Sequence, residues 1–361
     1  MQNRKNVILV AFVVLFLCIS CNKQQKSTMR SVTEFVNIDS LQVVELDGVN
    51  VDFNLLCPLD IQCVDTMLLF FEDYEGAMIK AYGLQSKRFL GSFLRKGGGP
   101  NEVALCSGFR QTLSHVDSPK IIIQSYPQYL AILDLYKSLQ EEHTVYEHKY
   151  SFRDNQRNAV FIASDAVYYI DKNTLLLTKN PERSGKSDDY NVYFELYDYR
   201  NNHVINSFYA TNLPFIPNAA LLYRGAQCIS ADYKKVVIFM YYMPMFSITD
   251  IDTGTSRQIY PFGKKNNLQA YIDEPGEFYK DVYCTSHRIV ALYKDGVQLG
   301  DKGASPSYFH VFDWNGNLLH KIKVKDDIKC FSLDEKSGMV YAAMMNDEEV
   351  KQYDMKRYII E

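Results

Sequence analysis

The sequence predicts an all-β protein, a six-bladed β-propeller of four-stranded antiparallel blades closed by an N-terminal strand. The composition and two markers that recur in the same order along the chain predict this fold. Tyr (27) and Phe (21) are abundant, and alternating apolar runs are common, whereas no stretch keeps an apolar period of 3.6 residues. Hydrophobic residues make up 47% of the 361 residues, which is enough for a large core.

The first marker is a short apolar strand that holds a small residue, followed by a tight turn and a longer apolar strand. It is clearest at Cys228, Cys284 and Cys330 and faintest at Cys106. The marker recurs at positions 63, 106, 162, 228, 284 and 330. The intervals of 43 to 66 residues each accommodate about four strands, so the chain contains six blade-sized units.

The second marker is an apolar residue followed by Asp and a polar turn, 24 to 36 residues after the first marker. It occurs at Leu133-Asp134, Tyr197-Asp198, Ile251-Asp252, Phe312-Asp313 and Tyr353-Asp354. An Asp side chain accepts hydrogen bonds from its own turn, and the Gly or Asn that follows tolerates a positive φ. We therefore expect the hairpin between the third and fourth strands of a blade at each of these places.

Closure of the ring requires one more strand, because the sequence ends soon after Tyr353-Asp354 and leaves the last blade without its outer strand. Residues 41–46 (LQVVEL) form a spare N-terminal strand that can fill this place. Residues 357–360 are the alternative. We favour the N-terminal strand, which would leave no blade edge unpaired.

The N-terminus predicts export. Residues 1–20 place Arg4 and Lys5 before thirteen apolar residues, which are too few to span a bilayer but typical of a signal peptide. Cys21 then stands where bacterial lipoproteins are lipidated, so we expect a lipid anchor on Cys21. An ordinary secretory signal with a coincidental cysteine is the alternative. Residues 21–40 are polar and are expected to form a flexible tether to the propeller at 41–361.

Residues 95–102 (RKGGGPNE) lie between the first and second units. Gly97, Gly99, Pro100 and Glu102 match a G-x-G-P-G-E element, with Asn101 in place of the last Gly, and here the sequence resembles the TolB-like six-bladed β-propeller lipoproteins of Bacteroidetes. The resemblance implies the fold and a cell-envelope location, but no activity and no catalytic residue. In such lipoproteins an acidic run after the lipidated cysteine accompanies surface display. This run is absent here, so we expect an outer-membrane anchor that faces the periplasm.

Charge and motif content narrow the classes of function. Removal of residues 1–20 deletes two basic residues and no acidic ones, which changes the net charge from −4 to −6 and argues against a nucleic-acid partner. The histidines form no metal-binding pair, and no nucleophile motif is present, so we predict no metal, no cofactor and no catalytic residue. The GGGP segment is expected to be a tight turn between blades rather than an anion cradle.

The cysteines at the first marker occupy equivalent places in different blades, where we expect them to pack as small apolar residues and to lie too far apart for disulfides. Cys57 and Cys63 are close enough in sequence for one bridge, and this question stays open at the level of sequence.

Loop lengths indicate where a partner would bind. In a propeller, the connections from second to third strands and from blade to blade emerge on one face, here the long-connection face, and they include 179–190, 210–225, 263–279 and 295–307. The remaining hairpins form the short-turn face. Because long loops on a rigid scaffold often carry function, we expect binding residues at Arg183, Lys186, Asp188, Asp189, Tyr190, Phe215, Tyr223, Arg224, Tyr271 and Lys302.

Mixed charge and exposed aromatics suit a glycan, a peptide or an envelope protein. The predicted function is therefore a non-enzymatic binding or scaffold module that uses the long-connection face. A polysaccharide or peptide lyase or hydrolase, with its site at the central funnel of the same face, is the alternative.

Overall fold

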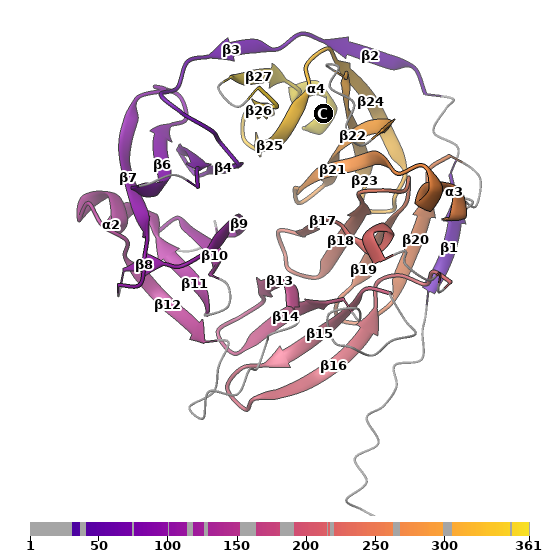
Figure 1. Ribbon diagram of the computed structural model, residues 1–361, viewed down its shortest axis with the longest axis horizontal. Coiled ribbons are helices and arrows are strands. Elements are labelled where there is room, and N and C mark those ends of the chain that lie inside the picture. Colours follow the sequence, from indigo (N-terminus) through magenta and orange to yellow (C-terminus); the bar gives the residue numbers. More distant parts are fainter. Residues whose placement is uncertain are drawn as a thin grey trace, which may run out of the picture.

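The computed structural model describes residues 31–360 except 37–40, 74–75, 100, 114–117, 126–128, 152–163, 181–190, 215, 217–219, 263–267, 299–304 and 347–348. Six β-sheets surround a central axis, and each sheet follows the previous one along the chain (Figure 1). The predicted six-bladed β-propeller is confirmed. No helix in the described part of the chain is both long and apolar enough to cross a membrane.

The first three blades are antiparallel meanders that run outward from the axis. The first contains β4 (Asp60–Val64), β5 (Met67–Phe71), β6 (Ala77–Gly83), β7 (Phe89–Lys96) and the short parallel β8 (Glu102–Val103). The second contains β9 (Cys106–Leu113), β10 (Lys120–Ser125), β11 (Tyr129–Asp134) and β12 (Tyr146–Ser151). The third contains β13 (Ser164–Tyr169), β14 (Thr174–Lys179), β15 (Tyr193–Asp198) and β16 (His203–Tyr209).

The last three blades follow the same order and also accept strands from the N-terminus. The fourth contains β17 (Gly225–Ile229), β18 (Lys235–Met240), β19 (Phe246–Asp250) and β20 (Ser256–Tyr260). The fifth contains β21 (Gly276–Cys284), β22 (Arg288–Gln298), β23 (Ser307–Asp313) and β24 (Leu318–Val324). The sixth contains β25 (Ile328–Asp334), β26 (Met339–Met344) and β27 (Val350–Asp354).

The core lies between neighbouring blades. Second strands are buried on both faces, as in β5, where all five residues are buried, and this explains why these strands read as continuous apolar runs. The predicted hairpins follow their third strands. In the β19–β20 turn the capping residue is Asp250, two residues before the predicted marker Asp252. The Asp250 carboxylate accepts the Thr253 N–H at 2.8 Å, and Gly254 takes a φ of +66°.

The N-terminal segment wraps around the rim of three blades as a belt (Figure 1). Strand β1 (Ser31–Phe35) pairs in parallel with β20, β2 (Val43–Leu46) pairs in parallel with β24, and β3 (Val49–Val51) pairs antiparallel with β27. An N-terminal strand closes the sixth blade as predicted, but it is β3. Residues 41–46 were expected there, but their strand, β2, is a fifth strand of the fifth blade.

The alternative closing segment at the C-terminus forms helix α4 (Lys356–Ile359) instead of a strand. The segment expected as a tether also contains structure, because β1 lies within residues 21–40. Since β2 and β3 occupy consecutive blades, the strand that meets the last blade is the one that follows 41–46 in the sequence.

The connections obey the predicted division into two faces, with one exception. Helix α2 (Leu135–Gln140) lies between β11 and β12, on the short-turn face, where only a short hairpin was expected. The marker residue Asp134 caps this helix by accepting the Lys137 N–H, so the same Asp begins a helix here. Helix η2 (Ala220–Tyr223) and helix α3 (Leu268–Asp273) lie in connections between blades, on the long-connection face.

Candidate functional site

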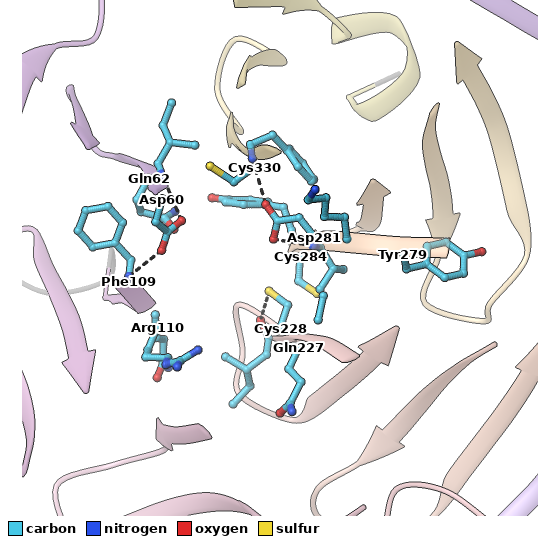
Figure 2. Close-up of a pocket in the computed structure, with 18 of the residues that line it drawn as sticks. Asp60, Gln62, Phe109, Arg110, Gln227, Cys228, Tyr279, Asp281, Cys284 and Cys330 are labelled. Carbon is cyan, nitrogen blue, oxygen red and sulfur yellow. Dashed lines mark hydrogen bonds between the residues drawn. The ribbon is translucent and has the colours of Figure 1, made fainter. Parts of the chain in front are cut away.

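A cavity of about 500 Å³ occupies the centre of the ring. Residues of five inner strands line it, namely β4, β9, β17, β21 and β25. Residues from both faces complete the lining: Tyr241 and Tyr242 from the β18–β19 connection, and Ser230, Ala231, Tyr233 and Glu335 from turns of the short-turn face. Figure 2 shows Asp60 and Asp281 extending into the cavity from β4 and β21, and Arg110 from β9. The lining combines carboxylates, a guanidinium group, amides, phenols and thiols, so the cavity is polar and suited to a small polar group.

Asp60 and Asp281 occupy equivalent places in the first and fifth blades, each three residues before a cysteine of the first marker. The Asp60 carboxylate accepts the N–H of the next residue, Ile61, at 2.8 Å and that of Phe109 in the second blade at 2.7 Å. The Asp281 carboxylate accepts the Val282 N–H at 2.9 Å, and it also accepts the N–H of Phe331 in the sixth blade at 3.0 Å. Each carboxylate therefore joins the inner strands of two neighbouring blades.

Other polar side chains join the remaining blades near the axis. Ser332 in the sixth blade accepts the Cys63 N–H of the first blade at 2.8 Å. Gln111 in the second blade exchanges two hydrogen bonds of 2.9 Å with the main chain of Tyr169 in the third blade. Thr178 in the third blade donates to Gln227 in the fourth at 2.8 Å. These bonds hold the inner strands in register around the cavity, where apolar packing between blades is thinnest.

The two carboxylates titrate near neutrality. Burial raises the pKa of Asp60 to about 6, although two backbone N–H donors act in the opposite direction. Burial also raises the pKa of Asp281, and the nearby charge of Asp60 raises it further, to about 7. Both residues are half-buried because they face the cavity. The charge of the cavity wall therefore changes between pH 5 and pH 8.

The thiols near the axis are inert at neutral pH. Burial raises the pKa of Cys284 and of Cys330 well above its ordinary value, so both groups stay protonated and are poor nucleophiles. The neighbouring Cys228 thiol in the fourth blade also contributes to the raised pKa of Cys284. The six described cysteines are free, so Cys57 and Cys63 form no bridge in this structure.

Cys106 does not share the place of the other cysteines in the repeat. Asp60 bonds to Phe109 as Asp281 bonds to Phe331, so Gly108 is the counterpart of Cys330 and Cys106 lies two residues earlier. Its side chain packs in the core between the first two blades and does not line the cavity. The faint marker at 106 was therefore out of register.

Among the described residues that line the cavity, no thiol or hydroxyl is paired with a histidine that could serve as its base. No group of three His, Cys, Asp or Glu side chains is arranged to hold a metal ion in the described part of the chain. The groups suited to proton transfer near neutral pH are Asp60 and Asp281, and each already accepts two backbone hydrogen bonds.

Most of the binding residues expected from the sequence lie outside the described residues, as does the lipidation candidate Cys21. The undescribed binding candidates are Arg183, Lys186, Asp188, Asp189, Tyr190, Phe215 and Lys302. Of the other three, Arg224 is exposed on the long-connection face. Tyr271 is half-buried and packs edge-on against Phe278 at 5.4 Å between ring centres.

Tyr223 is not an exposed aromatic, contrary to expectation. Helix η2 turns Leu222 and Tyr223 inward, and Tyr223 is among the largest fully buried side chains. Its hydroxyl donates to the Pro214 carbonyl at 2.6 Å. This tyrosine holds the connection between the third and fourth blades against the core.

The exposed side chains of the long-connection face include aliphatic residues that sequence analysis did not select. Five of them are 41% to 55% exposed and lie in connections around the axis: Leu56, Leu59, Leu105, Leu221 and Met345. Leu59 also lines the cavity. They stand in four different connections of this face, with Leu56 and Leu59 in the same one.

The GGGP segment forms a tight turn between blades, which confirms the prediction. Glu102 accepts the Gly99 N–H at 2.8 Å, and the Gly97 N–H donates to the Val103 carbonyl at 2.9 Å. A Cβ at position 97 would lie 2.0 Å from a Glu102 carboxylate oxygen, so the Glu102 side chain would have to move to admit one. In this arrangement the Glu102 carboxylate closes the turn by accepting the Gly99 N–H.

Residues 34–336 match the model of the TolB-like 6-blade propeller-like family. The chain belongs to this family. It is similar to the crystal structure of a DUF4221 family member from Bacteroides vulgatus, with 12% identity, a TM-score of 0.52 and coverage of 89% of this chain and 94% of the other. It also matches Raptor from Chaetomium thermophilum, with 9% identity, a TM-score of 0.48 and coverage of 86% and 29%. None of the curated proteins matches the sequence.

Sequence analysis of this TolB-like propeller missed Asp60 and Asp281. A signal for them was present, because an Asp precedes a marker cysteine by three residues in two blades. Without the ring, however, nothing in the sequence indicates that these two carboxylates enter the same cavity.

Proposed function

We propose that this protein is a cell-envelope lipoprotein that acts as a non-enzymatic binding module through its long-connection face. In this proposal Cys21 carries the lipid and the propeller is a rigid platform. The observation that carries the binding role is that aliphatic side chains and Arg224 are exposed in connections of the long-connection face. Interface cores use apolar side chains surrounded by polar ones, and this surface combines both.

A polypeptide, either a peptide or the surface of an envelope protein, is the partner that this surface favours over a glycan. Leu56, Leu59, Leu105, Leu221 and Met345 provide aliphatic contact area, whereas the aromatic candidates Tyr223 and Tyr271 are withdrawn into the protein. The cavity below them could take one polar side chain or chain terminus of such a partner.

The test compares two matched triple variants of the lipidated protein. One carries Leu56→Ser, Leu221→Ser and Arg224→Ala on the long-connection face. The other carries Asn201→Ala, Lys234→Ala and Asn315→Ala on the short-turn face. Partners captured from solubilised envelopes are identified by mass spectrometry and then titrated as purified proteins. We expect the first variant to lose the partner and the second to keep it. The reverse pattern would place binding on the other face.

Membrane attachment is tested separately with Cys21→Ser. We expect the wild type to incorporate labelled acyl chains and to fractionate with membranes, and the variant to be released into the soluble fraction. A variant that stays with the membranes would refute attachment through this cysteine.

An enzyme remains the second candidate because two carboxylates with pKa values of about 6 and about 7 share one cavity. Such a pair can act as general acid and general base in the hydrolysis or elimination of a polysaccharide or peptide. The wild type would then cleave members of a panel of polysaccharides and peptides, and Asp60→Asn or Asp281→Asn would abolish cleavage. A panel left intact by the wild type would count against this candidate.

A further inference from the structure

The belt fixes the place where the N-terminal chain leaves the propeller. Strand β1 pairs with β20 from Ser31, opposite Ser256, to Phe35, opposite Tyr260. Arg257 donates two hydrogen bonds of 2.7 Å to the Glu34 carboxylate, and the ring of Phe35 stacks on that of Tyr260 at 5.4 Å. A paired strand with a bidentate ion pair is a firm attachment, so the first described residue has a defined position on the fourth blade.

This position is on the short-turn side. Because β1 and β20 are parallel, Ser31 lies beside Ser256, the first residue of β20. Ser256 directly follows the β19–β20 turn, which belongs to the short-turn face. The chain from Cys21 therefore enters the domain at the rim of the fourth blade, next to that turn and away from the long-connection face.

The length of the connecting chain restricts how the domain can turn. Ten Cα–Cα steps separate Cys21 from Ser31, and they span at most about 35 Å when fully extended. A domain of this size is roughly 50 Å across. A lipid on Cys21 would therefore hold the edge of the fourth blade nearest Ser31 to the membrane. The exit point favours contact at this edge, because a chain to a lipid beyond the opposite face would first have to cross about 20 Å of rim.

The side chains near this edge suit the interface between lipid headgroups and water. The single tryptophan, Trp314, is half-buried in the β23–β24 turn of the short-turn face, where its indole N–H donates to the Thr285 carbonyl at 3.2 Å. This turn adjoins the fourth blade, since Arg257 donates to the Asn315 carbonyl at 2.8 Å and the Lys235 ammonium lies 5.6 Å from the centre of the Trp314 ring. Tryptophan and lysine are the residues that concentrate at membrane interfaces.

We propose that the lipid bilayer lies against the short-turn side of the fourth and fifth blades, so that the long-connection face is turned away from the membrane. This inference rests on the proposed lipid at Cys21 and adds an orientation to it. The orientation leaves the proposed binding face open to soluble partners and to the surfaces of other envelope proteins.

Energy transfer from tryptophan to dansyl-labelled phospholipid tests the orientation. The lipidated full-length protein is reconstituted into vesicles that contain the labelled lipid, with Trp314 as the single donor. A second protein combines Trp314→Phe with Leu221→Trp, which moves the donor to an exposed position on the long-connection face. The two faces are about 20 Å apart, the length of a six-residue strand, so we expect about twofold or greater transfer from Trp314 than from position 221.

Two further variants separate the effect of the lipid on Cys21 from the effect of the attachment of β1 to the fourth blade. Cys21→Ser should abolish both transfer and flotation with the vesicles. Glu34→Arg places like charges together beside Arg257 and should release β1, which lengthens the free chain and reduces the difference between the two donor positions. If the protein floats but position 221 transfers equally or better, the orientation is overturned and the lipid anchor stands. If the wild type does not float, both proposals fall.

Discussion

Replacement of the two cavity carboxylates by amides should change how stability depends on pH. Asp60 and Asp281 have pKa values raised to about 6 and about 7, whereas an unfolded Asp titrates near 3.9. Between these values the folded protein retains protons that the unfolded chain has lost. The free energy of unfolding therefore falls as the pH rises through this window, and it levels off above about pH 7.

The size of the effect follows from the number of protons. One proton held only by the folded state changes the free energy of unfolding by at most about 1.4 kcal/mol per pH unit, and two protons by about 2.7 kcal/mol. Water in the cavity reduces this effect because both carboxylates are half-buried. We expect each of Asp60→Asn and Asp281→Asn to gain about 1–3 kcal/mol relative to wild type between pH 5 and pH 8. At any one pH, replacing one acceptor oxygen by a donor costs about 1 kcal/mol.

Urea unfolding of wild type, both single variants and the double variant at several pH values measures this difference. Asp198→Asn is the control, because this carboxylate is half-buried in a turn outside the cavity and hydrogen bonds from Asn201 lower its pKa. Its contribution has the opposite sign and is lost as the pH falls. Parallel stability curves for wild type and the double variant from pH 5 to pH 8 would show that the cavity carboxylates are ionised throughout, and would refute the reasoning.

Three further predictions concern the scaffold. Deletion of residues 22–30 should leave the melting temperature, measured by circular dichroism, unchanged. Deletion of residues 22–51 removes β1, β2 and β3, exposes the edge of the sixth blade and should lower the melting temperature. Equal melting temperatures for the two deletions would contradict a closing role for the belt. Glu72→Ala should lower the free energy of unfolding in urea by about 1–3 kcal/mol, because this buried carboxylate accepts two backbone N–H bonds and pairs with Lys80 at 2.6 Å. Glu72→Gln should lower it less. An unchanged unfolding midpoint for Glu72→Ala would contradict a stabilising role of this carboxylate. Gly316→Ala should cost about 1–2 kcal/mol in the same assay, since its φ is +78° and a Cβ there would meet Ile259; a neutral result would show that this turn relaxes freely.

Several features of the propeller were predictable because they depend on residues close together in the sequence. Alternating and continuous apolar runs indicate strands, and the Asp turns indicate hairpins. The six blades and the two faces of the propeller could therefore be predicted from the sequence alone. The turn at Gly97 to Glu102 was predictable for the same reason, since its donors and acceptors lie within six residues.

The candidate site depended on contacts that no local pattern encodes. Asp60 and Asp281 are 221 residues apart, and only closure of the ring brings both into one cavity. The inward turn of Tyr223 depended on packing against the third and fourth blades. Tyr223 was predicted to bind a partner because it lies in a long connection, yet it packs in the core.

The sequence by itself determined the blades, their order, the sides from which their connections emerge and the need for an N-terminal strand, because strand period and turn chemistry are short-range properties. Only the tertiary structure decided that β3 rather than residues 43–46 closes the last blade, and that β1 fastens the chain to the fourth. A short apolar segment can pair with any open sheet edge. Its choice depends on where the preceding strands leave it around the ring, and that position exists only once the blades have assembled.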